Sequence, residues 1–290
     1  MLPVTDQDTH LPARIARIGA DDWTEDTDTV AVEEPMEIRI VQEVDGVISR
    51  RPLAVTMRTP GDDFELAVGF LFGEGLIASR EDFVDVSYCL DDDVQEEQYL
   101  NVVSVTLRPG LDLELSRVER NFYTTSSCGV CGKASLEALE MQACSPLTDR
   151  LIVDPAIIRM LPERLREAQS VFQKTGGLHG AGLFDVEGTL LDLCEDVGRH
   201  NALDKLIGKQ VIAGREHQPD RILLLSGRAS FELLQKALMA RIPIVAAVGA
   251  PSSLAVSLAA NFNITLCGFV RADGFNVYSA VERLARETAR

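Results

Sequence analysis

The C-terminal half of the chain alternates apolar runs with amphipathic ones, and this rhythm restricts the possible folds more than any other feature. Residues 221–226, 242–250 and 264–271 are nearly continuous apolar runs of strand length. Helix-like stretches over 229–241 and 252–263 separate them. Apolar strands of this kind are buried on both faces, and strand–helix alternation is typical of βαβ units. The pattern predicts a largely parallel sheet with helices on both faces.

The N-terminal half has a different pattern, in which strands come in pairs. Residues 36–57 alternate apolar and polar side chains around an Asp-Gly turn, which predicts a β-hairpin. A capped helix is expected over 59–77, followed by strands at 84–90 and 99–109. These elements predict a small α+β unit.

The chain therefore divides into four parts. Residues 1–32 are acidic, rich in Thr and without clear periodicity, which predicts a disordered tail. We expect an α+β domain over 33–120, a mobile loop with two cysteines over 121–135 and an α/β domain over 136–290. Within the last part, a hairpin is expected over 179–196.

Charge and composition exclude several classes of function. The formal net charge of −17 argues against a general affinity for nucleic acid, which depends on neutralising phosphates. No apolar run reaches the roughly 18 residues of a membrane span, and the polar N-terminus lacks the apolar core of a signal peptide. The six cysteines are too scattered for a disulfide framework, so we expect a reducing, cytoplasmic setting. Neither nucleic acid nor a membrane is expected as a partner.

The segment SSCGVCG holds the motif with the clearest chemistry. Its thiols, Cys128 and Cys131, lie three positions apart, and the glycines let the backbone bend around them. A helix is expected over 133–144, and both its electropositive start and the charge of Lys133 favour the nucleophilic thiolate. Such a pair can bind a metal, cycle as a disulfide or relay sulfur as a persulfide.

Spacing alone leaves these three roles open. A structural zinc site needs two more ligands, usually a second close pair, whereas Cys144, Cys194 and Cys267 each stand alone, and no metal site is predicted. A thioredoxin-type oxidoreductase places its CxxC after an early strand. Here the pair follows a Ser- and Thr-rich stretch in mid-chain.

Four other segments are candidates for ligand contact. A glycine-rich turn at 174–182 ends a helix predicted over 161–177, and charged residues surround a helix start at 195–205. The turns at 226–228 and 249–253 each follow a strand and open a helix, where open α/β sheets bind anions. A helix cap, a structural histidine and a ligand-free turn are the alternatives. The residues of interest are His179, His200, Gly227, Arg228 and Gly249.

Five motifs occur together and in this order: RNFYTTSSCGVCGKAS, TGGLHGAGLF, EDVGRHNALDKLIG, LSGRASFELLQKA and GFVR with FNVYS. In this combination the chain resembles the formate dehydrogenase accessory sulfurtransferase family, the FdhD type, over residues 35–280. The resemblance implies a cytidine-deaminase-like C-terminal α/β domain with a smaller α+β N-terminal domain. It also implies a homodimer that binds guanine nucleotide near the subunit interface.

The same resemblance implies a function. Such a protein accepts persulfide sulfur from a cysteine desulfurase of the IscS type. It transfers the sulfur to the molybdenum cofactor, bis-molybdopterin guanine dinucleotide, before insertion into formate dehydrogenase. The chain would be a sulfurtransferase with its persulfide on Cys128 and with Cys131 as helper or second carrier. The cofactor would be a bound substrate that GDP is expected to mimic. The segment implied to bind it is Phe269, Val270, Arg271, Ala272, Asp273 and Gly274.

The remaining candidate residues are expected to complete the cofactor site. Arg228, Arg271 and the turns at Gly227 and Gly249 would hold pyrophosphate and guanine, while His179 and His200 would line the pocket. One alternative is a non-enzymatic chaperone that binds the cofactor without taking up sulfur. Another, suggested only by the fold, is a zinc deaminase. Its H-x-E and P-C-x-x-C motifs are missing from this sequence.

Overall fold

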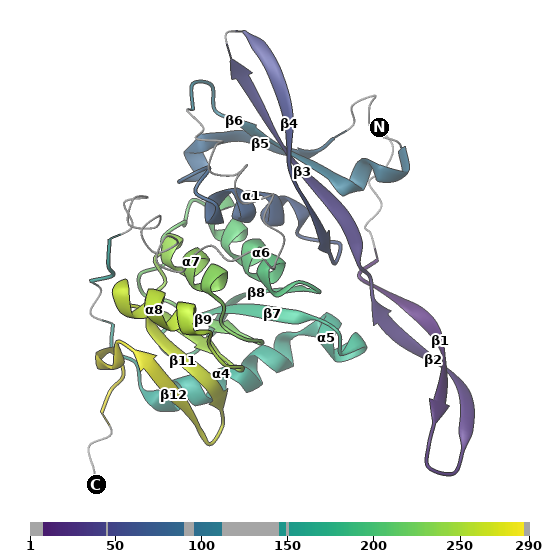
Figure 1. Cartoon of the computed structure of the whole chain (residues 1–290), viewed down its shortest axis with the longest axis vertical. Coiled ribbons are helices and arrows are strands. Elements are labelled where there is room, and N and C mark those ends of the chain that lie inside the picture. The colour runs from purple at the N-terminus through teal and green to yellow at the C-terminus, as the bar shows by residue number, and fades with distance from the viewer. Residues whose placement is uncertain (1–7, 45, 90–95, 112–144, 149–150, 287–290) are drawn as a thin grey trace.

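A computed structural model describes residues 8–44, 46–89, 96–111, 145–148 and 151–286 (Figure 1). In these residues the main body is layered: a four-stranded sheet with one helix against it, a layer of helices that this helix contacts, a six-stranded sheet, and helices on the far face of that sheet. A separate two-stranded hairpin extends from the body. None of the described helices is both long and apolar enough to cross a membrane.

The C-terminal sheet has the strand order β12-β11-β10-β9-β7-β8. Its strands are β7 (His179–Phe184), β8 (Leu190–Asp196), β9 (Ile222–Leu225), β10 (Ile244–Ala247), β11 (Thr265–Arg271) and β12 (Gly274–Ser279). The central strands β9, β10 and β11 run parallel, as the apolar runs predict. The predicted hairpin of β7 and β8 is confirmed, and β7 pairs antiparallel with β9. At the other edge β12 also pairs antiparallel. The sheet is therefore mixed, where the sequence pattern predicted a largely parallel one.

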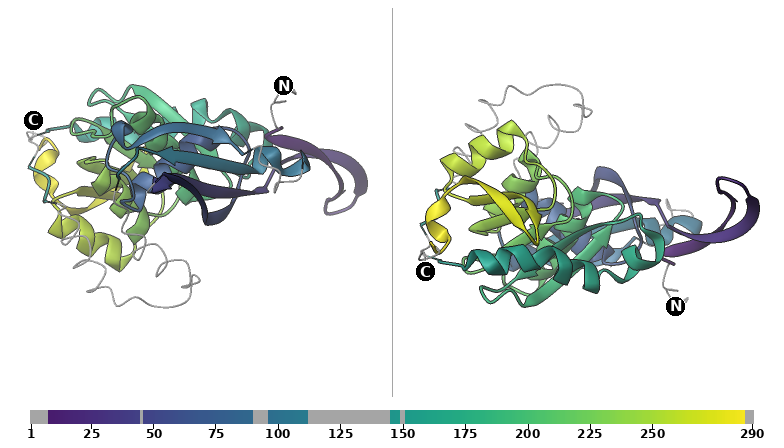
Figure 2. Two further views of the ribbon diagram at one scale, coloured as in Figure 1. Left: turned by 90° about the horizontal axis from the view of Figure 1, so that it is seen from above. Right: turned by 90° about the horizontal axis from the view of Figure 1, so that it is seen from below.

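Helices cover both faces of this sheet, as predicted. They are α4 (Pro155–Ala168), α5 (Ser170–Thr175), α6 (Arg199–Ile212), α7 (Phe231–Met239) and α8 (Ser253–Asn261). The α4 helix covers one face, and α6, α7 and α8 cover the other (Figure 2). Along β9, Leu223 and Leu225 enter the core beneath α6 to α8, whereas Ile222 and Leu224 enter the core beneath α4. This burial on both faces explains the continuous apolar runs.

The N-terminal sheet has the order β4-β3-β6-β5. Its elements are β3 (Glu34–Val44), β4 (Val47–Arg58), α1 (Asp63–Gly73), β5 (Phe83–Tyr88) and β6 (Val102–Leu107), with 3-10 turns at 80–82 and 96–101. The hairpin predicted over 36–57 is confirmed by the β3–β4 register. One apolar core runs from this sheet through α1 to α6, α7 and α8, so the N- and C-terminal units share their interior.

The two units meet where α1 crosses α6. A Cβ atom on Gly69 would lie 1.9 Å from the carbonyl oxygen of Asp204, and one on Gly208 would lie 1.9 Å from that of Glu65. Real Cβ atoms do not approach backbone this closely, so the two helices touch backbone to backbone. Only glycine at both positions permits this contact.

Buried ion pairs flank the crossing. Lys205 Nζ lies 2.7 Å from a carboxylate oxygen of Asp196, and both side chains are almost fully buried. The same ammonium group donates to the carbonyl of Thr59, whose own N–H donates to Asp196. Lys236 pairs in the same way with Asp204 at 2.7 Å. Both pairs lie within the C-terminal unit, and buried charges are tolerated only when they are paired. The Lys205–Asp196 pair reaches the N-terminal unit through its hydrogen bonds with Thr59, and these bonds help to fix how the two units dock.

The expectation of a disordered tail over 1–32 is wrong for much of its length. Residues 10–31 form an antiparallel hairpin of β1 (His10–Ile18) and β2 (Trp23–Ala31), paired from end to end. Trp23 and Ile18 are 73% and 71% exposed, so the hairpin has no core of its own. Backbone pairing and a contact between β2 and α5 hold it instead. Neither interaction requires a periodic pattern of apolar residues, so the sequence pattern did not predict the hairpin.

We predict that Gly208→Ala destabilises the protein by about 3 kcal/mol, because the new methyl group would overlap the Glu65 carbonyl oxygen. The same change in an unhindered helix would stabilise it by about 0.5–1 kcal/mol. Denaturant unfolding measures the difference. Gly177→Ala, in the connection between α5 and β7, is the control for an unhindered methyl group, since its Cβ would have no neighbour closer than 3.9 Å. Equal stability of Gly208→Ala and wild type would contradict the backbone contact.

Candidate functional site

The parallel strands β9, β10 and β11 end at one edge of the C-terminal sheet. Because β7 runs antiparallel to β9, its first residue, His179, lies at that same edge. The last residue of β8, Asp196, pairs directly with His179. The topology thus brings together turns that are far apart in sequence, and ligands commonly bind at such an edge of an α/β sheet.

His179 lies against the turn after β9. A Cβ on Gly227 would lie 3.3 Å from Nδ1 of His179, so the glycine leaves room for the ring. Burial, assisted by the positive charge of Arg199, lowers the pKa of His179. The ring is therefore neutral at pH 7 and can either accept or donate a hydrogen bond.

The start of α6 contributes a second basic group to this edge. His200 Nε2 lies 3.2 Å from the Ser230 hydroxyl and 3.8 Å from a carboxylate oxygen of Glu232. Hydrogen bonding with His200 lowers the pKa of Glu232 to about 2. The Nε atom of the preceding Arg199 is buried and has no hydrogen-bond partner among the residues that the structure describes.

The turns after β9 and β10 lie against each other. A Cβ on Gly249 would be 3.0 Å from Cγ of Arg228, so the arginine stem passes directly over this glycine. Gly249 N–H donates to the Gly227 carbonyl, and the Gly249 carbonyl accepts from Phe269. Phe269 is 41% exposed and has a left-handed backbone, with φ +55°. His179, His200, Gly227, Arg228 and Phe269 therefore gather at one sheet edge.

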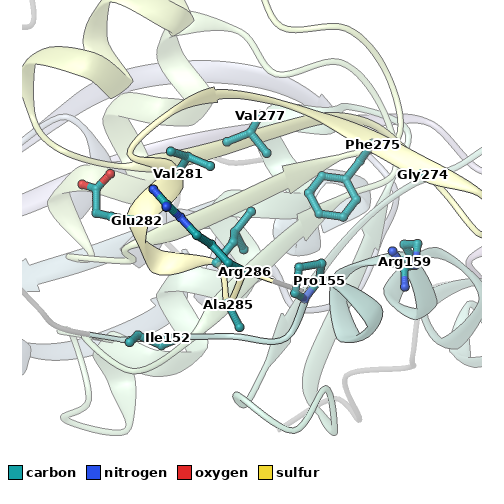
Figure 3. A pocket seen from close by; sticks show the side chains of 11 residues that line it. Ile152, Pro155, Arg159, Gly274, Phe275, Val277, Val281, Glu282, Ala285 and Arg286 are labelled. Carbon is teal, nitrogen blue, oxygen red and sulfur yellow. The ribbon is translucent and has the colours of Figure 1, made fainter. Parts of the chain in front are cut away.

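The implied cofactor-binding segment 269–274 does not stay at this edge. Val270 is buried in the core beneath α4. Arg271, Ala272 and Asp273 are exposed where β11 turns into β12. Gly274 instead lines a different cavity of about 660 Å³ between β12 and the start of α4, into which the Phe275 ring points (Figure 3).

A cavity of about 440 Å³ opens beside His179 at the sheet edge. Sequence reasoning placed His179 and Gly177 near a ligand but missed the other side of this cavity, which the α4–α5 junction supplies. Its lining residues there are Pro162, Leu165, Arg166, Gln169 and Phe172. The only sequence signal was the end of an amphipathic helix, which is also common where no ligand binds. The helix predicted over 161–177 begins earlier, at Pro155, and breaks at Gln169.

The motif cysteines Cys128 and Cys131 lie outside the described residues, as does the loop over 121–135. Of the other thiols, Cys194 and Cys267 are buried, and burial raises the pKa of each to about 12. They are protonated at neutral pH and are poor nucleophiles. In the described part of the chain, no group of three or more His, Cys, Asp or Glu side chains is arranged to hold a metal.

The lowered pKa of His179 predicts a pH dependence of stability. The unfolded chain takes up a proton near pH 6.5, whereas the folded protein resists it, so the free energy of unfolding falls as pH drops below that value. His179→Gln should therefore lose less stability than wild type between pH 7 and pH 5, as measured by thermal unfolding. His217→Gln, at an exposed site, is the control and should follow wild type. Parallel curves for wild type and His179→Gln would refute the assignment.

Comparison with known proteins places this geometry in context. The model of the FdhD/NarQ family matches residues 31–285. Sulfur carrier protein FdhD of Streptomyces coelicolor is 50% identical over 264 residues, covering 90% of this chain and 91% of the relative. The protein of the same name from Mycobacterium tuberculosis is 49% identical over 275 residues, covering 93% and 97%.

A solved structure is also similar. It is described as that of a formate dehydrogenase accessory protein from Desulfotalea psychrophila, with a TM-score of 0.72 and 26% identity over 96% of this chain and 100% of that one. With a family match over most of its length and relatives near 50% identity, the chain belongs to the FdhD/NarQ family.

Proposed function

We propose that this protein is a cytoplasmic sulfur carrier required for formate dehydrogenase activity. It accepts persulfide sulfur from a cysteine desulfurase of the IscS type and transfers it to bis-molybdopterin guanine dinucleotide. The names of its relatives support the sulfur carrier role. The observation that carries the proposal is that turns distant in sequence meet at one sheet edge beside a cavity, in a chain that also has a CxxC motif.

The chemistry begins with thiol exchange. The Cys128 thiolate attacks the outer sulfur of the desulfurase persulfide, a new S–S bond forms on Cys128, and the desulfurase cysteine leaves as its thiolate. Cys131 can then attack Cys128 Sγ, which releases hydrosulfide and leaves a disulfide between the two cysteines. The pair thereby supplies the two electrons that reduce the carried sulfur. The buried thiols Cys194 and Cys267 take no part.

The sheet edge is suited to the nucleotide end of the cofactor. The turn at Gly227 opens towards α7, and the turn at Gly249 leads to α8, whose N-terminus Ser252 caps. Arg228 is exposed above Gly249 and can reach a phosphate, where a guanidinium binds bidentately. The neutral ring of His179 supplies a hydrogen bond without adding charge. Arg271, at the β11–β12 turn, is proposed as an outer contact.

Three further features belong to the same proposal. The C-terminal unit has a cytidine-deaminase-like fold, which its mixed sheet between two helix layers supports. The protein acts as a homodimer. It docks on formate dehydrogenase, which the description of the similar solved structure supports.

The alternative is a chaperone that binds the cofactor without carrying sulfur. Its support is the same sheet edge, since nucleotide binding there needs no thiol. Sulfur uptake separates the two functions.

We predict that incubation with a cysteine desulfurase and cysteine adds one sulfur atom to the wild-type protein, as seen by intact mass, and that dithiothreitol removes it. Cys128→Ala should gain none. Cys89→Ala is the control, because Cys89 is buried and lies outside the motif. No gain in wild type would favour the chaperone, and an equal gain in Cys128→Ala would place the sulfur elsewhere.

A further inference from the structure

The hairpin of β1 and β2, residues 10–31, projects from the body as an arm (Figure 1, Figure 2). Its two strands pair over nine residues, so it reaches about 30 Å at the usual rise of a strand. The match to the family model begins at residue 31, the last residue of the arm. A long hairpin without a core of its own adds little to the stability of the body, so the arm calls for a role outside it.

Both long edges of the arm are protected against strand pairing. On β2, the N–H groups of Thr27 and Thr29 donate to the carboxylates of the preceding Asp26 and Asp28, each at 2.8 Å. On β1, Pro12 lies opposite Thr29 and has no N–H to donate. Exposed edges protected in this way resist pairing with other chains. A contact between the arm and another molecule must therefore use its side chains.

The far end of the arm carries its largest apolar side chains. Ile18 and Trp23 pair across the two strands, so their side chains lie on the same face. Both are largely exposed, and Trp23 is the only tryptophan of the chain. Tryptophan is the residue type most enriched among those that dominate the binding energy of interfaces. This pair is suited to enter an apolar pocket on another protein.

Carboxylates surround the apolar pair. Asp21 and Asp22 lie in the turn next to it, and Glu25 follows Trp23 by two positions on the same face of the strand. All three acidic residues are exposed. A complementary surface would have an apolar pocket with Lys or Arg at its rim. The phosphates of a nucleic acid or of an anionic membrane would be repelled.

A second copy of this chain fits the tip poorly. The arm holds five carboxylates and two guanidinium groups, and one of these, that of Arg17, is paired with Asp26 at 3.0 Å. The chain as a whole has a net charge of −17. Since the protected edges also oppose strand exchange between copies, a different protein with a basic surface is the better occupant.

The root of the arm lies beside the cavity at the sheet edge. The β2 strand contacts α5, and a Cβ on Gly177 would lie 3.9 Å from the Cβ of Ala31, the last residue of β2. Gly177 also lines the cavity of about 440 Å³, together with Gly176 and Phe172 of the same region. A protein held by the tip of the arm would therefore be kept close to this cavity.

We propose that the arm docks the formate dehydrogenase that receives the cofactor, with Ile18 and Trp23 entering an apolar pocket whose rim carries Lys or Arg. This rests on the proposed function, in which the cofactor passes from the sheet edge to that enzyme. The other protein partner, the cysteine desulfurase, needs access to Cys128 rather than to the cavity. A second contact through the arm raises the effective concentration of the receiving enzyme at the site.

The test is surface plasmon resonance with the full-length protein immobilised and cofactor-free formate dehydrogenase in solution. We predict that Trp23→Ala weakens binding about 10-fold or more, because a tryptophan buried in a pocket is a frequent hot spot. Glu25→Lys should slow association. Raising the salt from about 50 to about 200 mM should weaken binding of wild type more than that of Glu25→Lys, because salt screens the acidic rim.

Two variants serve as matched controls. Ile48→Ala truncates an exposed apolar side chain near the turn of another hairpin, that of β3 and β4. Glu187→Lys reverses an exposed charge at the turn between β7 and β8. Both should bind formate dehydrogenase as wild type does. Because all four substituted side chains are exposed, the main thermal unfolding transition should not change in any variant.

Several outcomes would overturn the inference, and they differ in what else they imply. If Trp23→Ala and Glu25→Lys bind formate dehydrogenase as tightly as wild type, the arm is not the docking element, and the proposed function stands. If wild type does not bind the enzyme, the docking part of the proposed function fails as well.

The variants also test the other occupants. Loss of sulfur uptake from the desulfurase in Trp23→Ala, measured by intact mass, would assign the arm to the sulfur donor. A change of oligomeric state in Trp23→Ala, measured by size-exclusion chromatography with light scattering, would make the arm a contact between copies of this chain. Either result would replace formate dehydrogenase as the partner of the arm.

Discussion

The backbone contact between α1 and α6 is the constraint on which the rest of the structure depends. Gly69 and Gly208 let each helix approach the other's carbonyl groups, so the two units cannot slide without a clash. Two buried ion pairs, Lys205 with Asp196 and Lys236 with Asp204, lie on either side of this contact. A buried pair is weak evidence for stability, but breaking one is costly. The Lys205–Asp196 pair also bonds to the backbone of Thr59 in the N-terminal unit, which makes the docking geometry specific.

The hydrogen bonds of Asp196, beside the α1–α6 contact, link the N-terminal unit to the candidate site. Asp196 ends β8, pairs with His179 across the sheet and holds Lys205 on α6. Its carboxylate also accepts hydrogen bonds from the backbone of Thr59, in the N-terminal unit, and from Gly198 at the start of α6. The N-terminal unit thus helps to fix where Arg199 and His200 begin their helix. The described residues that line the cavity beside His179 all come from the C-terminal unit, and the N-terminal unit is part of the support for that cavity.

The proposed chemistry divides between two kinds of group. Reactive sulfur belongs to the CxxC motif, while burial keeps Cys194 and Cys267 protonated and inert. The sheet edge offers the neutral ring of His179, the guanidinium of Arg228 and two glycine turns, which suit phosphate and a heterocycle, and the carboxylate of Glu232 lies beside His200. Among the residues that the structure describes, the buried nitrogens Nε2 of Gln169 and Nε of Arg199 have no hydrogen-bond partner. Functional sites commonly retain such locally unfavourable groups because a ligand satisfies them.

The sequence by itself determined the strand and helix order of the main body, because strands buried on both faces must be apolar and helices must be periodic. Examples are β9 to β11 and the hairpin of β3 and β4. It also identified the CxxC motif and the family, since residue types and the order of motifs along the chain can be read directly from the sequence. Only the tertiary structure decided which turns meet. His179 and Gly227 are 48 positions apart (227 − 179), and their contact follows from the antiparallel pairing of β7 with β9.

Tertiary structure likewise revealed what periodicity does not encode. The β1–β2 hairpin is held by backbone pairing without a core, so its composition resembled that of a disordered tail. The segment 269–274 is continuous in sequence, yet the β11–β12 turn divides it between the sheet edge and a separate cavity. Gln169 looked like one more polar residue near a helix end, and only packing against Gly180 buries its amide. Burial and hydrogen-bond satisfaction depend on neighbours distant in the chain, and for that reason the sequence alone could not supply them.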